Sequence, residues 1–158
     1  ALPCSLGQLT KLELLFLDQN ALSGITCLAP LQRLRKLTAA SNALRSFPQG
    51  LSDVRGLQYL ILSDNAIPSL PSLANFSSSL VTLLAPRNRL AMPLPSFAGW
   101  AKLQTLDLNT NRLTLPPSAA AAAALFDNLP ALITLDLSAN RYHRFLKGEL
   151  SSFLCCAA

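Results

Sequence analysis

The side chains that could perform catalysis are few and scattered in this chain of 158 residues. The single histidine, His143, lies between Tyr142 and Arg144, and no carboxylate and nucleophile are grouped around it as a Ser-His-Asp arrangement would require. The six glycines stand at positions 7, 24, 50, 56, 99 and 148, so no glycine-rich phosphate-binding loop is present. The sequence therefore predicts a non-enzymatic protein without a cofactor.

Composition narrows the remaining classes of protein. A hydrophobic content of 51% with 13% charged residues predicts a folded domain, which we take to span 1–158 as a single unit and to be a possible piece of a longer chain. No stretch approaches the roughly 20 apolar residues of a membrane span. The net charge is +5, but lysine and arginine are scattered singly rather than interleaved with aromatics, so we do not expect nucleic-acid binding.

Six segments share the pattern Leu-x-x-Leu-x-Leu-x-x-Asn-x-Leu. They are Leu12 to Leu22, Leu34 to Leu44, Leu57 to Ile67, Leu80 to Leu90, Leu103 to Leu113 and Leu132 to Tyr142. Their asparagines, Asn20, Asn42, Asn65, Asn88, Asn111 and Asn140, are 22, 23, 23, 23 and 29 residues apart. These spacings fall within the roughly 20 to 29 residues of a leucine-rich repeat.

The pattern resembles the leucine-rich-repeat family over nearly the whole chain, from about Leu6 to about Phe153. Ala39 and Ala85 replace the third leucine in two repeats, and the last leucine is replaced in two others. The resemblance implies an α/β fold: a right-handed solenoid with a curved parallel sheet on its concave face and turns and short helices on its convex face. It also implies protein–protein interaction as the function.

Alternation within each segment leads to the same architecture. In the third segment, Leu60 and Leu62 are two residues apart and point inward from a strand, and one repeat cannot bury that face alone. We therefore expect six stacked parallel strands beginning near Leu12, Leu34, Leu57, Leu80, Leu103 and Leu132. The asparagine after each strand should hydrogen-bond the backbone of the turn, which predicts an internal amide ladder.

The segments between repeats carry apolar residues that should close the core from the convex side. These pairs are Leu6 and Leu9, Leu28 and Leu31, Leu51 and Val54, Leu73 and Phe76, Phe97 and Trp100, and Phe126 and Leu129. In the last segment, Pro116, Pro117 and Ser118 precede six alanines, which predicts a helix ending near Asn128. Two interpretations of this helix stay open: a compositional tract without a role, or a docking element.

Residues that alternate with the inward leucines should form the ligand-facing surface. One column reads Phe16, Thr38, Ile61, Leu84, Asp107 and Asp136, and the other reads Leu14, Lys36, Tyr59, Thr82, Thr105 and Thr134. We predict that Leu14, Phe16, Tyr59, Ile61 and Leu84 form a contiguous partner-binding patch, with Lys36, Asp107 and Asp136 contributing beside it. The competing interpretation is that such residues merely suit strands.

The position after each asparagine reads Ala21, Ala43, Ala66, Arg89, Arg112 and Arg141. The three arginines fall one per repeat, so we expect a short basic ridge beside Asp107 and Asp136. Exposed charges of this kind accelerate the approach of an oppositely charged partner. The hypothesis is that the ridge steers an acidic segment of the partner protein.

The four cysteines, at positions 4, 27, 155 and 156, lack the clustered spacing of a zinc site. We expect reduced thiols and an intracellular, cytoplasmic protein, with an extracellular location as the alternative. A disulfide between Cys4 and Cys27 would contradict this expectation most directly. The two lie on adjacent repeats, only one residue out of register, and could approach within bonding distance.

The leading functional hypothesis is a protein-binding scaffold or a fixed subunit of a larger assembly. A ligand-sensing receptor ectodomain is the second hypothesis, and oxidised cysteines or a sugar on Asn75, in the sequon Asn75-Phe76-Ser77, would favour it. A substrate-recognition arm of a larger enzyme is the third.

Overall fold

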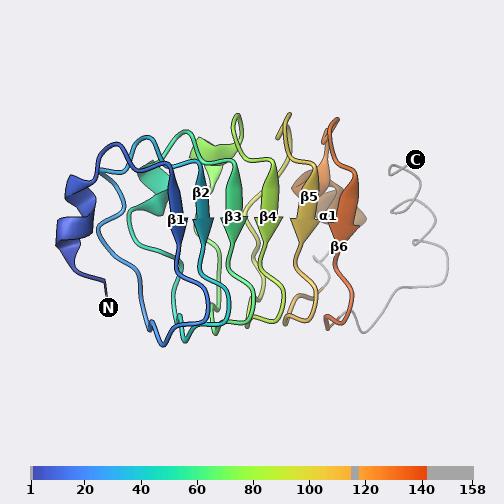
Figure 1. Ribbon diagram of the computed structural model, residues 1–158. Coiled ribbons are helices and arrows are strands. Elements are labelled where there is room, and N and C mark those ends of the chain that lie inside the picture. Colours follow the sequence, from blue (N-terminus) through green and yellow to red (C-terminus); the bar gives the residue numbers. More distant parts are fainter. Residues whose placement is uncertain (1, 115–117, 142–158) are drawn as a thin grey trace.

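The computed structural model describes residues 2–114 and 118–141, and in this part six parallel strands form one sheet in the order β1-β2-β3-β4-β5-β6. Their bounds are Leu14–Phe16 (β1), Lys36–Thr38 (β2), Tyr59–Ile61 (β3), Thr82–Leu84 (β4), Thr105–Asp107 (β5) and Thr134–Asp136 (β6). Figure 1 shows them as a row of arrows that all point the same way. The predicted parallel solenoid is confirmed. Tyr142 and His143 lie outside the described residues.

Each strand begins two residues after its predicted start. In five of the six repeats, the first leucine of the pattern belongs instead to the preceding turn, because its backbone N–H is bonded within that turn; these are Leu12, Leu34, Leu80, Leu103 and Leu132. Leu34 N, for example, donates to Leu31 O at 3.0 Å, and Leu132 N donates to Leu129 O at 3.1 Å. These N–H groups are therefore unavailable to the sheet.

The middle residue of each strand faces the core. The sheet register aligns Leu15, Leu37, Leu60, Leu83, Leu106 and Leu135. The four central leucines of this column are fully buried, whereas Leu15 is half-buried and Leu135 is exposed. The core is thus continuous through the middle repeats, as the stacking of units that cannot fold alone requires.

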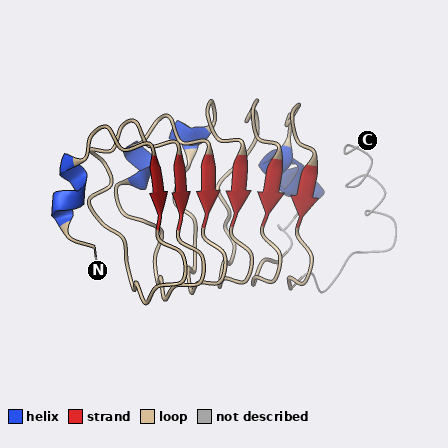
Figure 2. Ribbon diagram, viewed as in Figure 1, coloured by secondary structure: helices blue, strands red, loops and turns tan. Residues whose placement is uncertain are grey.

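Short helices close the core on the side opposite the concave face. They are η1 (Cys4–Gln8), η2 (Leu51–Asp53), η3 (Ala74–Phe76) and α1 (Ala119–Phe126), and Figure 2 shows η2, η3 and α1 behind the strands. Most of the predicted apolar pairs are buried there, including Phe76, Phe97 and Trp100. The prediction that Leu9 closes the core is wrong, because its side chain is 53% exposed. Leu9 lies in the first return segment, which in the described part has a neighbouring repeat on only one side.

The predicted alanine helix is present as α1 and begins after Ser118, whose Oγ accepts a hydrogen bond from Ala121 N at 3.1 Å. This is an N-cap, which stabilises helices by about 1 kcal/mol. The helix ends at Phe126, two residues before Asn128. Its end packs on the preceding return segment, where Phe97 N donates to Leu125 O at 2.8 Å and the rings of Phe97 and Phe126 stack at 6.0 Å.

The prediction of reduced thiols is wrong for one pair, because Cys4 and Cys27 form a disulfide with their Cα atoms 5.3 Å apart. Helix η1 lies directly against the second return segment: Gly7 is buried, and a Cβ there would stand 3.2 Å from the Cys27 carbonyl oxygen. Cys27 itself adopts a left-handed backbone conformation, with φ of 63°. Close packing of the two segments therefore overcomes the one-residue offset in register. Cys155 and Cys156 lie outside the described residues.

Within 2–114 and 118–141, the helices are too short to cross a bilayer.

Candidate protein-binding surface

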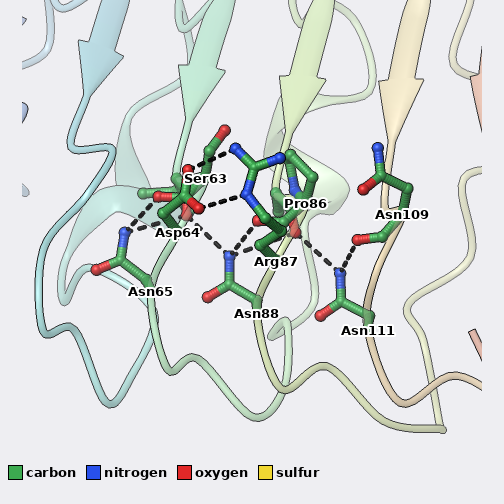
Figure 3. A network of polar contacts seen from close by, with 10 residues as sticks. Ser63, Asp64, Asn65, Pro86, Arg87, Asn88, Asn109 and Asn111 are labelled. Carbon is green, nitrogen blue, oxygen red and sulfur yellow. Dashed lines mark hydrogen bonds and ion pairs between the residues drawn. The ribbon is translucent and has the colours of Figure 1, made fainter. Parts of the chain in front are cut away.

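The asparagine after each strand fixes the geometry of the surface. Asn88 Nδ2 donates to Leu62 O of the preceding repeat at 2.8 Å, and Asn88 Oδ1 accepts from Ile67 N of that repeat at 3.0 Å. Asn42, Asn65, Asn111 and Asn140 make the same bridges, which confirms the predicted amide ladder; Figure 3 shows its central rungs. In the described part of the chain, Asn20 bonds only within its own repeat.

The residue before each asparagine adopts the left-handed backbone conformation. These residues are Gln19, Ser41, Asp64, Arg87, Thr110 and Ala139, with φ between 50° and 56°. The reversal lets the asparagine turn inward while the next residue emerges on the flank of the solenoid. Sequence reasoning missed this feature because none of the six is glycine, the usual signal for positive φ.

The outward side chains of the strands fall into the two predicted columns. Leu14, Lys36 and Tyr59 are aligned in one, and Phe16, Thr38 and Ile61 in the other, followed by Leu84. The most exposed apolar members are Phe16 at 58%, Leu14 at 52% and Tyr59 at 39%, whereas Ile61 and Leu84 are half-buried. The structure brings these residues onto one face, but β2 separates Leu14 and Phe16 from the rest.

Lys36 occupies the gap between the two apolar groups. Its Nζ lies 5.4 Å from the centroid of the Phe16 ring and 5.9 Å from that of the Tyr59 ring. Cation–π contacts at exposed sites contribute about 0.5 to 1 kcal/mol each. The lysine therefore joins the two aromatic side chains through its charge. The order of residues in the column predicts that Lys36 lies beside Tyr59. Its contact with Phe16 runs diagonally between the two columns and could be found only in the structure.

The second outward position of β2 is closed to a ligand. Thr38 is 4% exposed, and its hydroxyl donates to Asp18 Oδ2 at 2.6 Å. The other oxygen, Asp18 Oδ1, accepts from Ala40 N at 2.7 Å. Asp18 thus joins the first repeat to the second, a role that sequence reasoning missed.

Asp107 and Asp136 have structural partners of their own. Asp107 Oδ1 accepts from Asn109 N at 2.9 Å, and Asp136 Oδ1 accepts from Ser138 N at 2.9 Å. Asp136 Oδ2 also accepts from Asn109 Nδ2 at 3.1 Å, across the boundary between repeats. Hydrogen bonds from the Ser138 side chain and backbone hold the pKa of the Asp136 carboxyl below its usual value. Both carboxylates hold the turns after their strands.

The predicted arginines stand exposed on the flank, after the strand ends. The backbone N–H of Arg89, Arg112 and Arg141 donates to a carbonyl of the preceding repeat, at 3.0, 2.8 and 2.8 Å. This second ladder holds the three arginines one repeat apart. They form no ion pair with Asp107 or Asp136; the ion pairs of the described residues are Arg35 with Glu13 and Arg87 with Asp64.

Arg87 and Asp64 form a two-pronged contact between neighbouring turns (Figure 3). Arg87 Nη2 donates to Asp64 Oδ2 at 2.7 Å, and Arg87 Nε donates to Asp64 Oδ1. The hydrogen bonds from Arg87 lower the pKa of the Asp64 carboxyl, and the same pairing raises the pKa of Arg87.

Within the described ranges, no three or more His, Cys, Asp or Glu side chains gather into a group that could hold a metal ion.

Comparison with known proteins agrees with the repeat geometry. The family profile described as Leucine Rich Repeat matches residues 102–121. A solved leucine-rich-repeat protein of Leptospira interrogans superposes with a TM-score of 0.74 at 28% identity, covering 90% of this chain and 35% of the other. The chain is a leucine-rich-repeat protein.

Two further likenesses concern this leucine-rich-repeat chain. It is 31% identical over 147 residues to an adenylate cyclase of Schizosaccharomyces pombe, a match that covers 89% of the chain but 8% of the cyclase. A likeness over so small a share establishes no catalytic activity. The ectodomain of the Arabidopsis thaliana membrane receptor kinase GASSHO1/SCHENGEN3, solved with CASPARIAN STRIP INTEGRITY FACTOR 2, shares the fold with a TM-score of 0.63 at 22% identity, covering 96% of this chain and 24% of that one.

Proposed function

We propose that this leucine-rich-repeat protein binds a partner protein on its concave face and catalyses no reaction. Leu14, Phe16, Lys36 and Tyr59, called the anchor patch here, make the central contact. The observation that carries the proposal is the exposure of Phe16 and Tyr59 on either side of Lys36, on a sheet whose opposite face is buried through its four middle strands. Aromatic residues are typical anchors of protein interfaces.

Residues farther along the sheet extend this surface. Ile61 and Leu84 offer half-buried apolar area beside Tyr59. Arg89, Arg112 and Arg141 carry positive charge along the flank and would steer an acidic segment of the partner toward the sheet, as sequence analysis predicts. Asp107 and Asp136 contribute to the surface while they hold their turns.

Two roles fit such a surface. The first is a scaffold or fixed subunit of an assembly. The second, a ligand-sensing receptor ectodomain, gains support from the disulfide between Cys4 and Cys27. Disulfides persist in oxidising compartments and are rare in the cytosol, so this bond favours an extracellular location over the intracellular one expected from reduced thiols.

The test begins with an affinity pull-down using the intact protein, with mass spectrometry of bound proteins, and continues with Phe16→Asp against the partner found. We expect Phe16→Asp to weaken binding at least tenfold, because truncating an interface anchor costs about 2 kcal/mol or more. Thermal stability should change little, since surface substitutions stay within about 0.5 kcal/mol. Ile61→Asp is less suitable, because Ile61 is half-buried.

Leu9→Asp is the matched control, because Leu9 is as exposed as Phe16 but lies outside the sheet. It should leave the dissociation constant unchanged within about twofold. If Phe16→Asp folds normally and binds the partner with undiminished affinity, the anchor patch is ordinary strand sequence and the proposal is wrong.

A further inference from the structure

A groove of about 840 Å³ lies on the flank of the solenoid, beyond the ends of the strands. Its lining residues are Ala43, Arg45, Ala66, Pro68, Arg89, Ala91 and Arg112. It runs from the second repeat to the fifth and is separate from the anchor patch, sharing no residue with it.

The groove exists because small side chains lie between large ones on a fixed backbone. Ala43 N donates to Leu22 O and Ala66 N donates to Leu44 O, both at 2.9 Å, and the same ladder continues through Arg89 and Arg112. Backbone groups bonded from repeat to repeat hold the floor in place. The alanines and Pro68 leave a hollow between the longer arginine side chains.

The charge of the groove has one sign. Arg45, Arg89 and Arg112 contribute three exposed guanidinium groups, and none of the described residues that line the groove is acidic. In the part of the chain that the structure describes, none of the three forms an ion pair. Guanidinium groups are strong donors to carboxylates, so this arrangement is complementary to an acidic ligand.

We propose that the groove binds an extended acidic segment of the partner protein; this inference rests on the proposed protein-binding function and deepens it. Three repeat intervals of about 4.8 Å separate Arg45 from Arg112 along the solenoid, roughly 14 Å, which about four extended residues would span. Arg45 and Arg112, at this separation, do not converge on a single phosphate. They suit a segment with a carboxylate near each end and small residues over the alanine floor.

The experiment titrates the intact, isotope-labelled protein with the capped peptide Glu-Ala-Ala-Glu at low salt and follows backbone amides by NMR. We expect saturable shifts at Ala43, Ala66 and Ala91 and none with the capped peptide Gln-Ala-Ala-Gln. The triple variant Arg45→Gln, Arg89→Gln, Arg112→Gln should bind at least tenfold more weakly. Ala66→Phe, which fills the floor without changing charge, should weaken binding at least fivefold.

The control triple variant is Arg33→Gln, Arg55→Gln, Lys102→Gln, because these exposed residues lie in turns that precede strands, away from the groove. It should bind within twofold of the original protein. Equal losses in both triple variants would show attraction by net charge alone and overturn the proposal. So would an unchanged affinity in Ala66→Phe, provided that its melting temperature shows it folded.

The result is separable from the test of the anchor patch. The peptide needs no partner protein, and Phe16→Asp should leave its affinity for the groove unchanged. If the peptide does not bind, only the groove proposal is wrong. If the partner does not use the anchor patch, peptide binding to the groove is still expected.

Discussion

The amide of each ladder asparagine joins two repeats and closes its own turn at the same time. Asn88 is 8% exposed and uses both ends of its side chain, donating to three carbonyls and accepting from Ile67 N. Buried polar groups are costly when they lack partners. A substitution that removes the Asn88 amide should therefore leave several backbone groups without a hydrogen-bond partner at once.

We predict that Asn88→Ala lowers the free energy of unfolding by about 2 to 3 kcal/mol, the cost of leaving buried backbone groups unpaired. Asn20→Ala is the control, because Asn20 is exposed and, among the described residues, bonds only to Leu17 O and Asp18 O; it should cost less than about 1 kcal/mol. Urea unfolding followed by circular dichroism measures both. Equal losses for the two variants would show that bridging between repeats contributes nothing.

At the scale of elements, the N-terminal end depends on a covalent link. Helix η1 lies beside the second return segment, and Cys4 and Cys27 join them across 23 positions. A cross-link over a loop of this length restricts the unfolded chain and stabilises the fold by about 3 kcal/mol in the loop-entropy description. The end of the solenoid that carries Leu14 and Phe16 is thereby held in place.

We predict that Cys27→Ser lowers the melting temperature by several degrees and abolishes the effect of reductant on melting. The original protein should melt lower with dithiothreitol than without it. Peptide mapping under non-reducing conditions should find one linked pair containing Cys4 and Cys27. Recovery of both as free thiols from protein prepared without reductant would contradict the bridge.

At the scale of the whole molecule, stability comes from contacts between neighbouring repeats, as in other solenoids. Among the carboxylates that cross these boundaries, Asp64 pairs with Arg87 of the next repeat, and Asp136 accepts from Asn109 of the preceding one. Both have a pKa below the ordinary 3.8. A carboxyl whose pKa is depressed on folding stabilises the folded state above its unfolded pKa and loses that contribution as pH falls through the folded value.

We predict that the free energy of unfolding falls as pH drops below about 3.8, and that Asp64→Asn removes part of this dependence. The variant should be less stable than the original protein at neutral pH and approach it in strong acid. Asp53→Asn is the control, because Asp53 is exposed and its carboxylate makes no ion pair with any residue that the structure describes. Urea unfolding at several pH values between 2 and 7 decides; parallel curves for all three proteins would contradict the prediction.

Much of the fold and part of the candidate site followed from sequence because the repeat has a fixed period. A residue's place in the pattern, such as Leu60 inward, Tyr59 outward or Asn65 in the turn, sets its face without knowledge of any other contact. The pattern likewise put Arg89 and Arg112 in one column. It determined the solenoid, the amide ladder and the two outward columns.

Only the tertiary structure decided which outward residues are accessible and what they touch. Lys36 reaches diagonally to Phe16, and Thr38 is buried by its bond to Asp18; both depend on distances between repeats. Arg45 joins Arg89 at one groove although the two occupy different positions in their repeats. Cys4 and Cys27 meet because the first two return segments pack together. Return segments have no fixed period, so the distance between two of their residues is set by how the segments pack and cannot be taken from the sequence.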